Sequence, residues 1–372
     1  MRDTDRAPRG ETVSQVCLWM EVAGCPTICQ HCWARGIPYP AMPVADIAWV
    51  LDQARAACAA AGLVFSAFPM HEVAAHPEAS VVLRLFSTFP GDPSLDEGRP
   101  MFEPLSTTGV PLAPRPDWAE VLATCRDLGT TVVWPAVHGV GETHDRMVHR
   151  AGAYQETLLG IDRVRSAGLE VGCNIFPTRE NVVQFDTLVE DLLAHGVAQF
   201  AVQPASYIPT ARGRRYEALR PALADLVPLV EWVRSLPGPC FHRAVWADLA
   251  AHTEAAYVRR ALEGAWPASS EPRAEEIDLV CRPNLDLYWG TAGWYGRRYG
   301  NLRRDDAQEV LRAAMEDGGG SQDALWFALD PIPAVRDLAE RYGDPGGDRV
   351  HFSPESPRAV WLDLARRRQR VG

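Results

Sequence analysis

The sequence has no long apolar run. It nowhere reaches about 18 consecutive apolar residues, the minimum for a transmembrane helix, so we expect no membrane span. The N-terminal residues 1–5 are polar and lack the apolar centre of a signal peptide. We therefore expect a cytoplasmic protein, in which reduced thiols stay available to bind metal.

An excess of basic residues is also missing. The chain of 372 residues carries 37 Lys and Arg against 48 Asp and Glu, a net charge of −11. Proteins that bind the nucleic-acid backbone usually present a basic face. Only short basic stretches occur here, at 212–215 and 366–370, so we expect no nucleic-acid partner. With 47% hydrophobic and 23% charged residues, the composition is that of an ordinary globular protein.

Three of the nine cysteines stand close together, as Cys25, Cys29 and Cys32 in a Cys-x-x-x-Cys-x-x-Cys pattern. Three thiolates on one short loop can bind three irons of a four-iron cluster. Protein-bound clusters usually have four cysteine ligands, so a set of three leaves one iron for a ligand that the protein does not supply. The spacing therefore indicates a [4Fe–4S] cluster with one open iron.

Zinc and disulfides are the other interpretations of these cysteines. The three thiols and His31 would make a Cys₃His zinc site, although His31 stands directly between ligands in sequence, a poor spacing for a tetrahedral cage. Disulfides are disfavoured because nine is an odd number and the other six cysteines are scattered. Zinc stays open as an alternative, in which the protein is a zinc-stabilised binding protein and not an enzyme.

Strand-like and helix-like segments alternate along most of the chain. Strands are expected at 13–22, 63–68, 105–110, 130–137, 169–176 and 197–204, and helices at 44–61, 79–86, 117–128, 154–167 and 182–195. Such alternation is typical of parallel βα units. Periodicity alone leaves an open sheet and a partial barrel both possible.

The cysteine pattern, the aromatic Trp33 after its last cysteine and the order of elements resemble the radical S-adenosylmethionine (SAM) family. The resemblance covers residues 13 to about 235. It implies an α/β fold, a six-stranded partial (β/α)₆ TIM-like barrel with the cysteine loop directly after strand one. That order places the loop at the carboxyl end of a strand, where barrel active sites lie. We expect residues 1–12 to be a disordered tail and residues 13–236 to be the barrel.

The resemblance also implies the chemistry and the cofactors. In this family SAM binds the open iron, and the reduced cluster cleaves it to a 5′-deoxyadenosyl radical that abstracts a hydrogen atom from substrate. An electron donor such as flavodoxin or ferredoxin would be a partner. Cys25, Cys29 and Cys32 would be the metal ligands and catalytic residues, and Trp33 a cofactor-binding residue.

Further cofactor-binding candidates follow the next two strands. Glu72, in the sequence Pro-Met-His-Glu, stands where the family has Gly-Gly-Glu, and its carboxylate would suit the amino group of SAM, although both glycines are absent. Thr107, in the sequence Ser-Thr-Thr-Gly, stands where the family has Thr-Asn-Gly. An ordinary surface glutamate and a strand-ending turn are the plain alternatives.

Two amides are expected to face the barrel interior. By period-two alternation Asn174 points inward on the fifth strand and Gln203 on the sixth. Each would contact SAM or substrate, or be a satisfied interior amide. After the sixth strand, Tyr207, Arg212 and Arg214 are substrate candidates, because a guanidinium can hold a carboxylate or phosphate. A solvated basic loop is the alternative for them.

Residues 136–145 resemble a Ser-x-x-Gly…His-Asp stretch of family members with a SPASM domain, a C-terminal extension that carries extra clusters. Ala136 replaces the serine, and His144 with Asp145 is equally well a helix-capping pair. Residues 237–372 are expected to be a small α+β extension of this type. Only Cys240 and Cys281 lie there, too few for a four-iron cluster, so no auxiliary cluster is expected. These thiols are either hydrogen-atom donors or inert buried residues.

We therefore expect a radical SAM enzyme of specialised metabolism that acts on a small metabolite or a peptide. A ribosomal-peptide maturase is the alternative that the SPASM-like features suggest. The short N-terminal tail speaks against it, because it leaves no room for a leader-binding domain.

Overall fold

The computed structural model describes residues 15–32, 36–89, 101–103, 105–202, 205, 215–235, 249–253, 255–256, 259, 276–290, 297–317 and 348–350. Every strand expected from the βα rhythm is present. These strands are β1 (Gln15–Ala23), β2 (Val64–His71), β3 (Leu105–Thr107), β4 (Val132–Val137), β5 (Glu170–Ile175) and β6 (Gln199–Val202). The expected α/β class with parallel strands is confirmed.

The strands are hydrogen-bonded in two sheets rather than one. β1 pairs with β2 in parallel, and β3, β4, β5 and β6 pair in parallel in that order, whereas no ladder joins β2 to β3 in the described part of the chain. β7 (Glu276–Cys281) pairs with β1 in parallel, followed by the antiparallel strands β8 (Asp286–Trp289) and β9 (Arg298–Asn301). The expected single six-stranded sheet is therefore wrong in its strand count, because the C-terminal part extends the first sheet.

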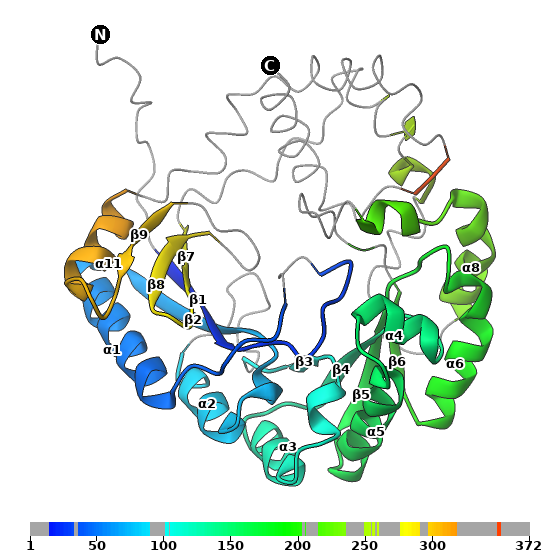
Figure 1. Ribbon diagram of the computed structural model, residues 1–372, viewed down its shortest axis with the longest axis horizontal. Helices are drawn as coiled ribbons and strands as arrows, with labels where there is room; N and C mark the ends of the chain where they lie inside the picture. Colours follow the sequence, from blue (N-terminus) through cyan, green and yellow to red (C-terminus); the bar gives the residue numbers. More distant parts are fainter. Residues whose placement is uncertain are drawn as a thin grey trace.

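Helices cover the outer side of the arc that the strands form (Figure 1). They are α1 (Val44–Ala61), α2 (Ala79–Phe86), α3 (Trp118–Asp127), α4 (Glu142–Val148), α5 (Ala153–Ser166), α6 (Phe185–Ala194), α8 (Leu223–Ser235) and α11 (Ala307–Glu316). Single 3₁₀ turns are η1 (Val73–Ala75), η2 (Val110–Leu112), η3 (Val182–Gln184), η4 (Glu217–Leu219) and η5 (Leu249–His252). In α1 the apolar stripe that includes Ile47, Val50 and Leu51 is buried, and Gly62 ends the helix in the left-handed conformation with φ of 70°.

Apolar side chains also cover the inner face of the second sheet. Val133 and Cys173 belong to the main core under the helices, whereas Trp134 and Ala201 belong to a separate cluster on the opposite face. The Trp134 indole lies over Gly172, where a Cβ atom would stand 2.4 Å from a ring carbon. Because this tryptophan fills the interior beside β5, polar groups that meet a ligand must come from the carboxyl end of the strands.

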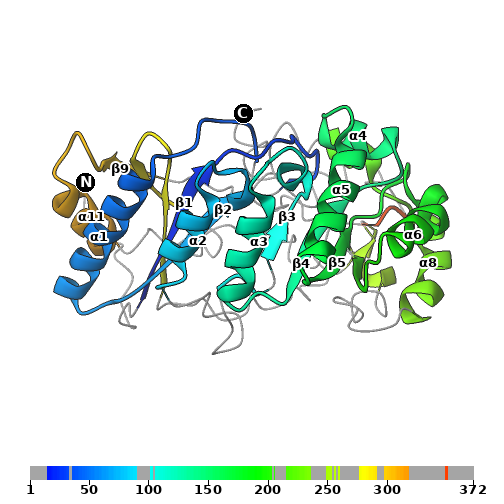
Figure 2. The same cartoon turned by 90° about the horizontal axis from the view of Figure 1, so that it is seen from below.

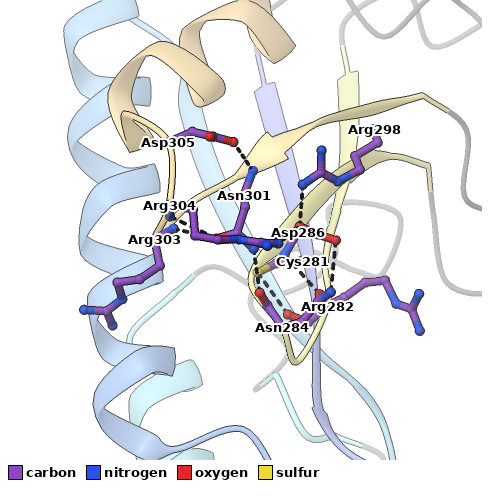
Figure 3. A network of polar contacts seen from close by, with 9 residues as sticks. All are labelled: Cys281, Arg282, Asn284, Asp286, Arg298, Asn301, Arg303, Arg304 and Asp305. Atoms are coloured by element: carbon purple, nitrogen blue, oxygen red, sulfur yellow. Dashed lines mark hydrogen bonds and ion pairs between the residues drawn. The ribbon is translucent and has the colours of Figure 1, made fainter.

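The C-terminal hairpin is held together by a buried carboxylate, that of Asp286 (Figure 3). Asp286 accepts hydrogen bonds from the Arg298 guanidinium at 2.7 Å and from the side-chain amides of Asn284 and Asn301 at 2.9 Å each. The Arg298 hydrogen bond is the main reason that the pKa of Asp286 falls to about 2. Arg303 reaches the other way, toward α1, where its guanidinium lies 4.3 Å from the Trp49 ring centre. The network fixes the strands that extend the first sheet.

No helix in the ranges given above has the length and apolarity to cross a membrane. The expected tail at 1–12 and the expected domain boundary at 236–237 fall on or next to residues outside the described part of the chain.

Replacing Asp286 tests the hairpin network. We expect Asp286→Ala to lower the free energy of unfolding by about 2 kcal/mol in urea titrations, because the buried Asn301 amide and the charged Arg298 lose their acceptor. The control is Glu316→Ala, which removes the partner of the exposed Arg312 and should change that free energy by at most about 1 kcal/mol. Equal losses in the two variants would contradict a special role for Asp286.

Candidate functional site

The three clustered cysteines lie on the loop between β1 and α1, which reaches across to α4. The backbone N–H of Ile28 donates to the Val148 carbonyl at 2.8 Å, and that of Gln30 donates to the Met147 carbonyl at 3.1 Å. Both carbonyls belong to the last turn of α4, where helix carbonyls lack intrahelical partners. Loop and helix lie at the edge of the molecule to which β1 points (Figure 2). The loop is therefore fixed to α4 in its middle, and its far end returns to β1, where the Met42 backbone N–H donates to the Val22 carbonyl at 2.8 Å.

The sulfur atoms of the three cysteines are held around two small residues. The Thr27 hydroxyl lies 3.1 Å from Cys25 Sγ and 3.4 Å from Cys29 Sγ. The Gly36 backbone N–H donates to Cys32 Sγ at 3.2 Å, and a Cβ atom at Gly36 would stand 3.5 Å from Cys25 Sγ and 3.6 Å from Cys32 Sγ. Thr27 thus bridges the first two sulfurs, and Gly36 lies between the first and the third.

Burial keeps the first thiol neutral in the protein alone. Burial, and then the negative charge of Glu72, raise the pKa of Cys25 to about 12. Metal ligation needs the thiolate, so loading a metal at this loop must displace a proton from Cys25.

The zinc alternative needs His31 beside the three thiols, all around one ion. A zinc site gathers its donors on a single ion. Within the described residues no group of three or more His, Cys, Asp or Glu side chains is arranged to hold a metal ion. In a four-iron cluster each thiolate binds a different iron, so the sulfurs surround a larger group. His31, the fourth ligand of the zinc alternative, packs its ring at 4.4 Å from His138 and 4.3 Å from Phe176.

Glu72 and Thr107, two of the sequence candidates, meet at the ends of β2 and β3. Glu72 is 2% exposed and accepts from the Thr107 hydroxyl at 2.8 Å, from the Thr108 hydroxyl at 2.9 Å and from the Thr108 backbone N–H at 2.5 Å. Burial raises the pKa of Glu72, and these hydrogen bonds oppose the rise. The carboxylate therefore joins two strands that no ladder connects, and the surface-glutamate alternative is wrong.

Asn174 has a setting that suits contact with a ligand. It is half-buried on β5, and its partners in register are Ala136 on β4 and Ala201 on β6. The structure shows no hydrogen bond of its side-chain amide within the described residues. Because its neighbours on both sides are small, the Asn174 amide has room to contact a ligand in the interior, as the strand alternation predicts.

A neutral histidine cluster lies at the carboxyl ends of β4 and β5. His144 Nδ1 accepts from the His138 backbone N–H at 3.1 Å, which places the ring hydrogen of His144 on Nε2. Burial lowers the pKa of His144 to about 4, and burial together with His31 and His144 lowers the pKa of His138 well below its ordinary value. Asn181 donates to the carbonyls of His138 and Phe176 and fixes both loops.

Of the His-Asp pair, Asp145 caps a helix, whereas His144 accepts from the His138 backbone. The Asp145 carboxylate accepts from the backbone N–H groups of Gly152 at 2.6 Å and Tyr154 at 2.9 Å, at the start of α5. Cys281 lies in the main core beneath α1, and its pKa is raised by burial. That position fits a buried inert thiol and not a hydrogen-atom donor facing the barrel interior.

Several expected site residues lie outside the described part of the chain. They are Trp33, Gln203, Tyr207, Arg212, Arg214 and Cys240. Their proposed roles stay predictions.

Sequence reasoning missed one charged group at this end of the barrel. Glu21 on β1 is nearly buried, and its carboxylate lies 3.5 Å from His71 Nε2 and 3.4 Å from Arg282 Nε. The signal for it was a glutamate inside an otherwise buried strand. The pairing itself has no local signal, because its members stand far apart in sequence.

Replacing Glu72 tests its role between β2 and β3. Glu72→Ala leaves a buried backbone N–H and two hydroxyls without their acceptor, and we expect a loss of about 3 kcal/mol in the free energy of unfolding. Glu72→Gln keeps one acceptor oxygen and should lose about half as much. A Glu72→Ala protein as stable as the wild type in urea titrations would show that the carboxylate does not join the strands.

The neutral histidines predict a pH dependence. Because the folded pKa of His144 is depressed, the unfolded chain takes up a proton that the folded chain refuses between pH about 6.5 and about 4, so stability falls as pH falls through this window. His144→Asn keeps an acceptor for His138 and should make the slope shallower by about 1.4 kcal/mol per pH unit. Urea titrations at several pH values measure the slope, with His149→Asn, at an exposed position, as control. A slope that His144→Asn leaves unchanged would contradict the prediction.

Comparison with protein-family models and with curated proteins gave no match. Among solved structures, SuiB of Streptococcus suis bound to the precursor peptide SuiA is similar at 14% identity over 81% of this chain, with a TM-score of 0.45. This chain spans 65% of that SuiB chain. The protein anSMEcpe with bound AdoMet and Cp18Cys peptide matches at 12% identity over 96% of this chain and 100% of its own, with a TM-score of 0.46. HemN of Escherichia coli, a coproporphyrinogen III oxidase described as a radical SAM enzyme, matches at 13% identity over 95% and 90%, with a TM-score of 0.43. These likenesses are distant, and the chemistry of the site rests on its own residues.

Proposed function

We propose that this chain is a radical SAM enzyme in which Cys25, Cys29 and Cys32 hold three irons of a [4Fe–4S] cluster. The observation that supports it most directly is the placement of the three sulfurs around Thr27 and Gly36 at the carboxyl end of β1. When bound, the cluster and SAM supply a 5′-deoxyadenosyl radical that abstracts a hydrogen atom from the substrate.

The residues around the cysteines orient the sulfurs and exclude water. Thr27 and the Gly36 backbone supply the hydrogen bonds that fix the sulfur positions, and hydrogen bonds to sulfur also tune such clusters. Cys25 and Cys29 are 8% and 9% exposed, whereas Cys32 is half-buried. The loop therefore keeps bulk water and stray hydrogen donors away from two of the three sulfurs.

The proposed contacts with SAM come from several strand ends. They are Trp33, Glu72, Thr107, Asn174 and Gln203. Thr107 acts by holding the Glu72 carboxylate in place, because its hydroxyl is engaged there. Asn174 supplies an amide between two alanines. Tyr207, Arg212 and Arg214 are proposed to contact the substrate.

The substrate is proposed to be a small metabolite or a peptide of specialised metabolism, in the cytoplasm. A flavodoxin or ferredoxin would be the electron donor, and residues 237–372 are proposed to form an extension without an auxiliary cluster. A closed substrate cavity would favour a metabolite, and an open groove a peptide.

Anaerobic reconstitution tests the proposal. The wild-type protein should bind iron and sulfide, turn brown, and form 5′-deoxyadenosine from SAM with dithionite. Cys29→Ala should lose the colour and reduce 5′-deoxyadenosine to the level of a protein-free control. Cys58→Ala, which removes a buried thiol between α1 and α11, is the matched control and should keep both. A colourless wild-type protein that holds zinc and forms no 5′-deoxyadenosine would favour the zinc-stabilised binding protein instead.

A further inference from the structure

The inner face of the first sheet carries a row of aromatic side chains. Phe68, Trp19, Val280 and Tyr288 stand opposite one another in register on β2, β1, β7 and β8. We call Phe68, Trp19 and Tyr288 the aromatic row. Trp19 and Tyr288 are half-buried and pack on the buried Val280 and Met70, in a cluster separate from the main core under the helices. Aromatic rings that stay partly exposed on the inner face of a barrel can contact a molecule in its interior.

The Trp19 ring is held in one orientation by two neighbours. It stacks on Phe68 with ring centres 4.9 Å apart and an angle of 29° between the ring planes. Its indole N–H donates to the Asp278 carboxylate at 2.9 Å. Asp278 is a charged residue in the middle of β7, between buried neighbours, a position that costs desolvation free energy. Because the indole N–H is engaged there, the ring offers an apolar contact and not a further hydrogen bond.

A guanidinium stands next to the aromatic row. Arg298 on β9 is the register partner of Tyr288, so the two side chains share a face and their strands lie about 5 Å apart. Figure 3 shows Arg298 and Arg282 extending to the side of the hairpin away from α1. Arg298 is 44% exposed and donates to Asp286 through one amino group, and its other N–H groups have no partner among the described residues. These donors suit a carboxylate.

The aromatic row lies inside the barrel beneath the cysteine loop. Trp19 precedes Ala23, the last residue of β1, by four residues, which is about 13 Å along a strand. The cysteine loop continues from that end of β1. A molecule on the row therefore lies on the inner side of the sheet, below the cysteines, where a substrate of the proposed chemistry would have to be.

We propose that the aromatic row and Arg298 form the substrate subsite for a small aromatic carboxylic acid. Its ring packs on Trp19 and Tyr288, and its carboxylate accepts from the Arg298 guanidinium. Tyr288 and Arg298 are one strand spacing apart, so a single small molecule spans both contacts. The inference rests on the proposed function in calling this molecule the substrate, and it selects a small metabolite over a peptide.

Fluorine NMR of cluster-reconstituted protein labelled with 5-fluorotryptophan tests the subsite. Trp19→Phe identifies the Trp19 resonance by removing it, and Phe68→Leu identifies it independently by shifting it. The probe is 3-phenylpropionate; 3-phenylpropan-1-ol lacks its charge and butyrate lacks its ring. We expect 3-phenylpropionate to move the Trp19 resonance and to bind about tenfold more tightly than either partial probe. A Trp19 resonance that 3-phenylpropionate leaves in place overturns the proposal.

Replacing Arg298 separates its contact with the probe from its part in the fold. Arg298→Gln keeps a donor for Asp286 and removes the charge, so it should weaken 3-phenylpropionate about tenfold and leave 3-phenylpropan-1-ol unchanged. Arg297→Gln is the matched control, because Arg297 pairs with Asp317 instead, and should change neither affinity. Equal losses for both probes in Arg298→Gln contradict the proposal, because Arg298 would then act only through the fold.

The two proposals fail in different ways. A wild-type protein that forms no 5′-deoxyadenosine from SAM contradicts the proposed function, while the fluorine titration still tests the subsite, because the probe needs neither cluster nor SAM. A wild-type protein that forms 5′-deoxyadenosine, with a Trp19 resonance that does not respond to 3-phenylpropionate, contradicts only the subsite.

Discussion

The buried carboxylate of Glu72 links the parts of this molecule that matter most for its proposed chemistry. It stands at the end of β2, is hydrogen-bonded to Thr107 and Thr108 at the end of β3, and its charge acts on Cys25. No backbone ladder connects β2 with β3 among the described residues. One side chain therefore contributes both to the relative position of the two sheets at this end and to the electrostatics of the cysteine loop.

The strand ends on one side of the cysteine loop carry charged residues, and those on the other side carry neutral histidines. On the side of β1, β2 and β7, the strand ends carry Glu21 and Arg282 in an ionised pair. On the side of β4 and β5, His138 and His144 stay neutral among aromatic rings. This asymmetry arises from which strand supplies each residue, and not from any single motif.

The features that depend on local sequence pattern could be predicted from the sequence. The bounds of α1 and α2 are those expected from their apolar stripes, and the spacing of the three cysteines already indicated a shared site. Glu72 and Thr107 were proposed from separate segments, and the structure brings them together. The left-handed φ of His71 and the parallel pairing of β7 with β1 had no sequence signal, because both depend on residues distant along the chain.

The position of β1 has a consequence for how the chain reaches its native state. β1 is synthesised long before one of its two sheet neighbours, β7, which begins only at Glu276. Until β7 arrives, an almost wholly buried strand keeps a row of unsatisfied backbone donors and acceptors along one edge. Pairing across so long a stretch of chain is slow, because a large loop must close first. Interrupted synthesis would thus leave an aggregation-prone sheet with one unpaired edge. The yield of soluble protein should therefore depend on chaperones and on translation speed.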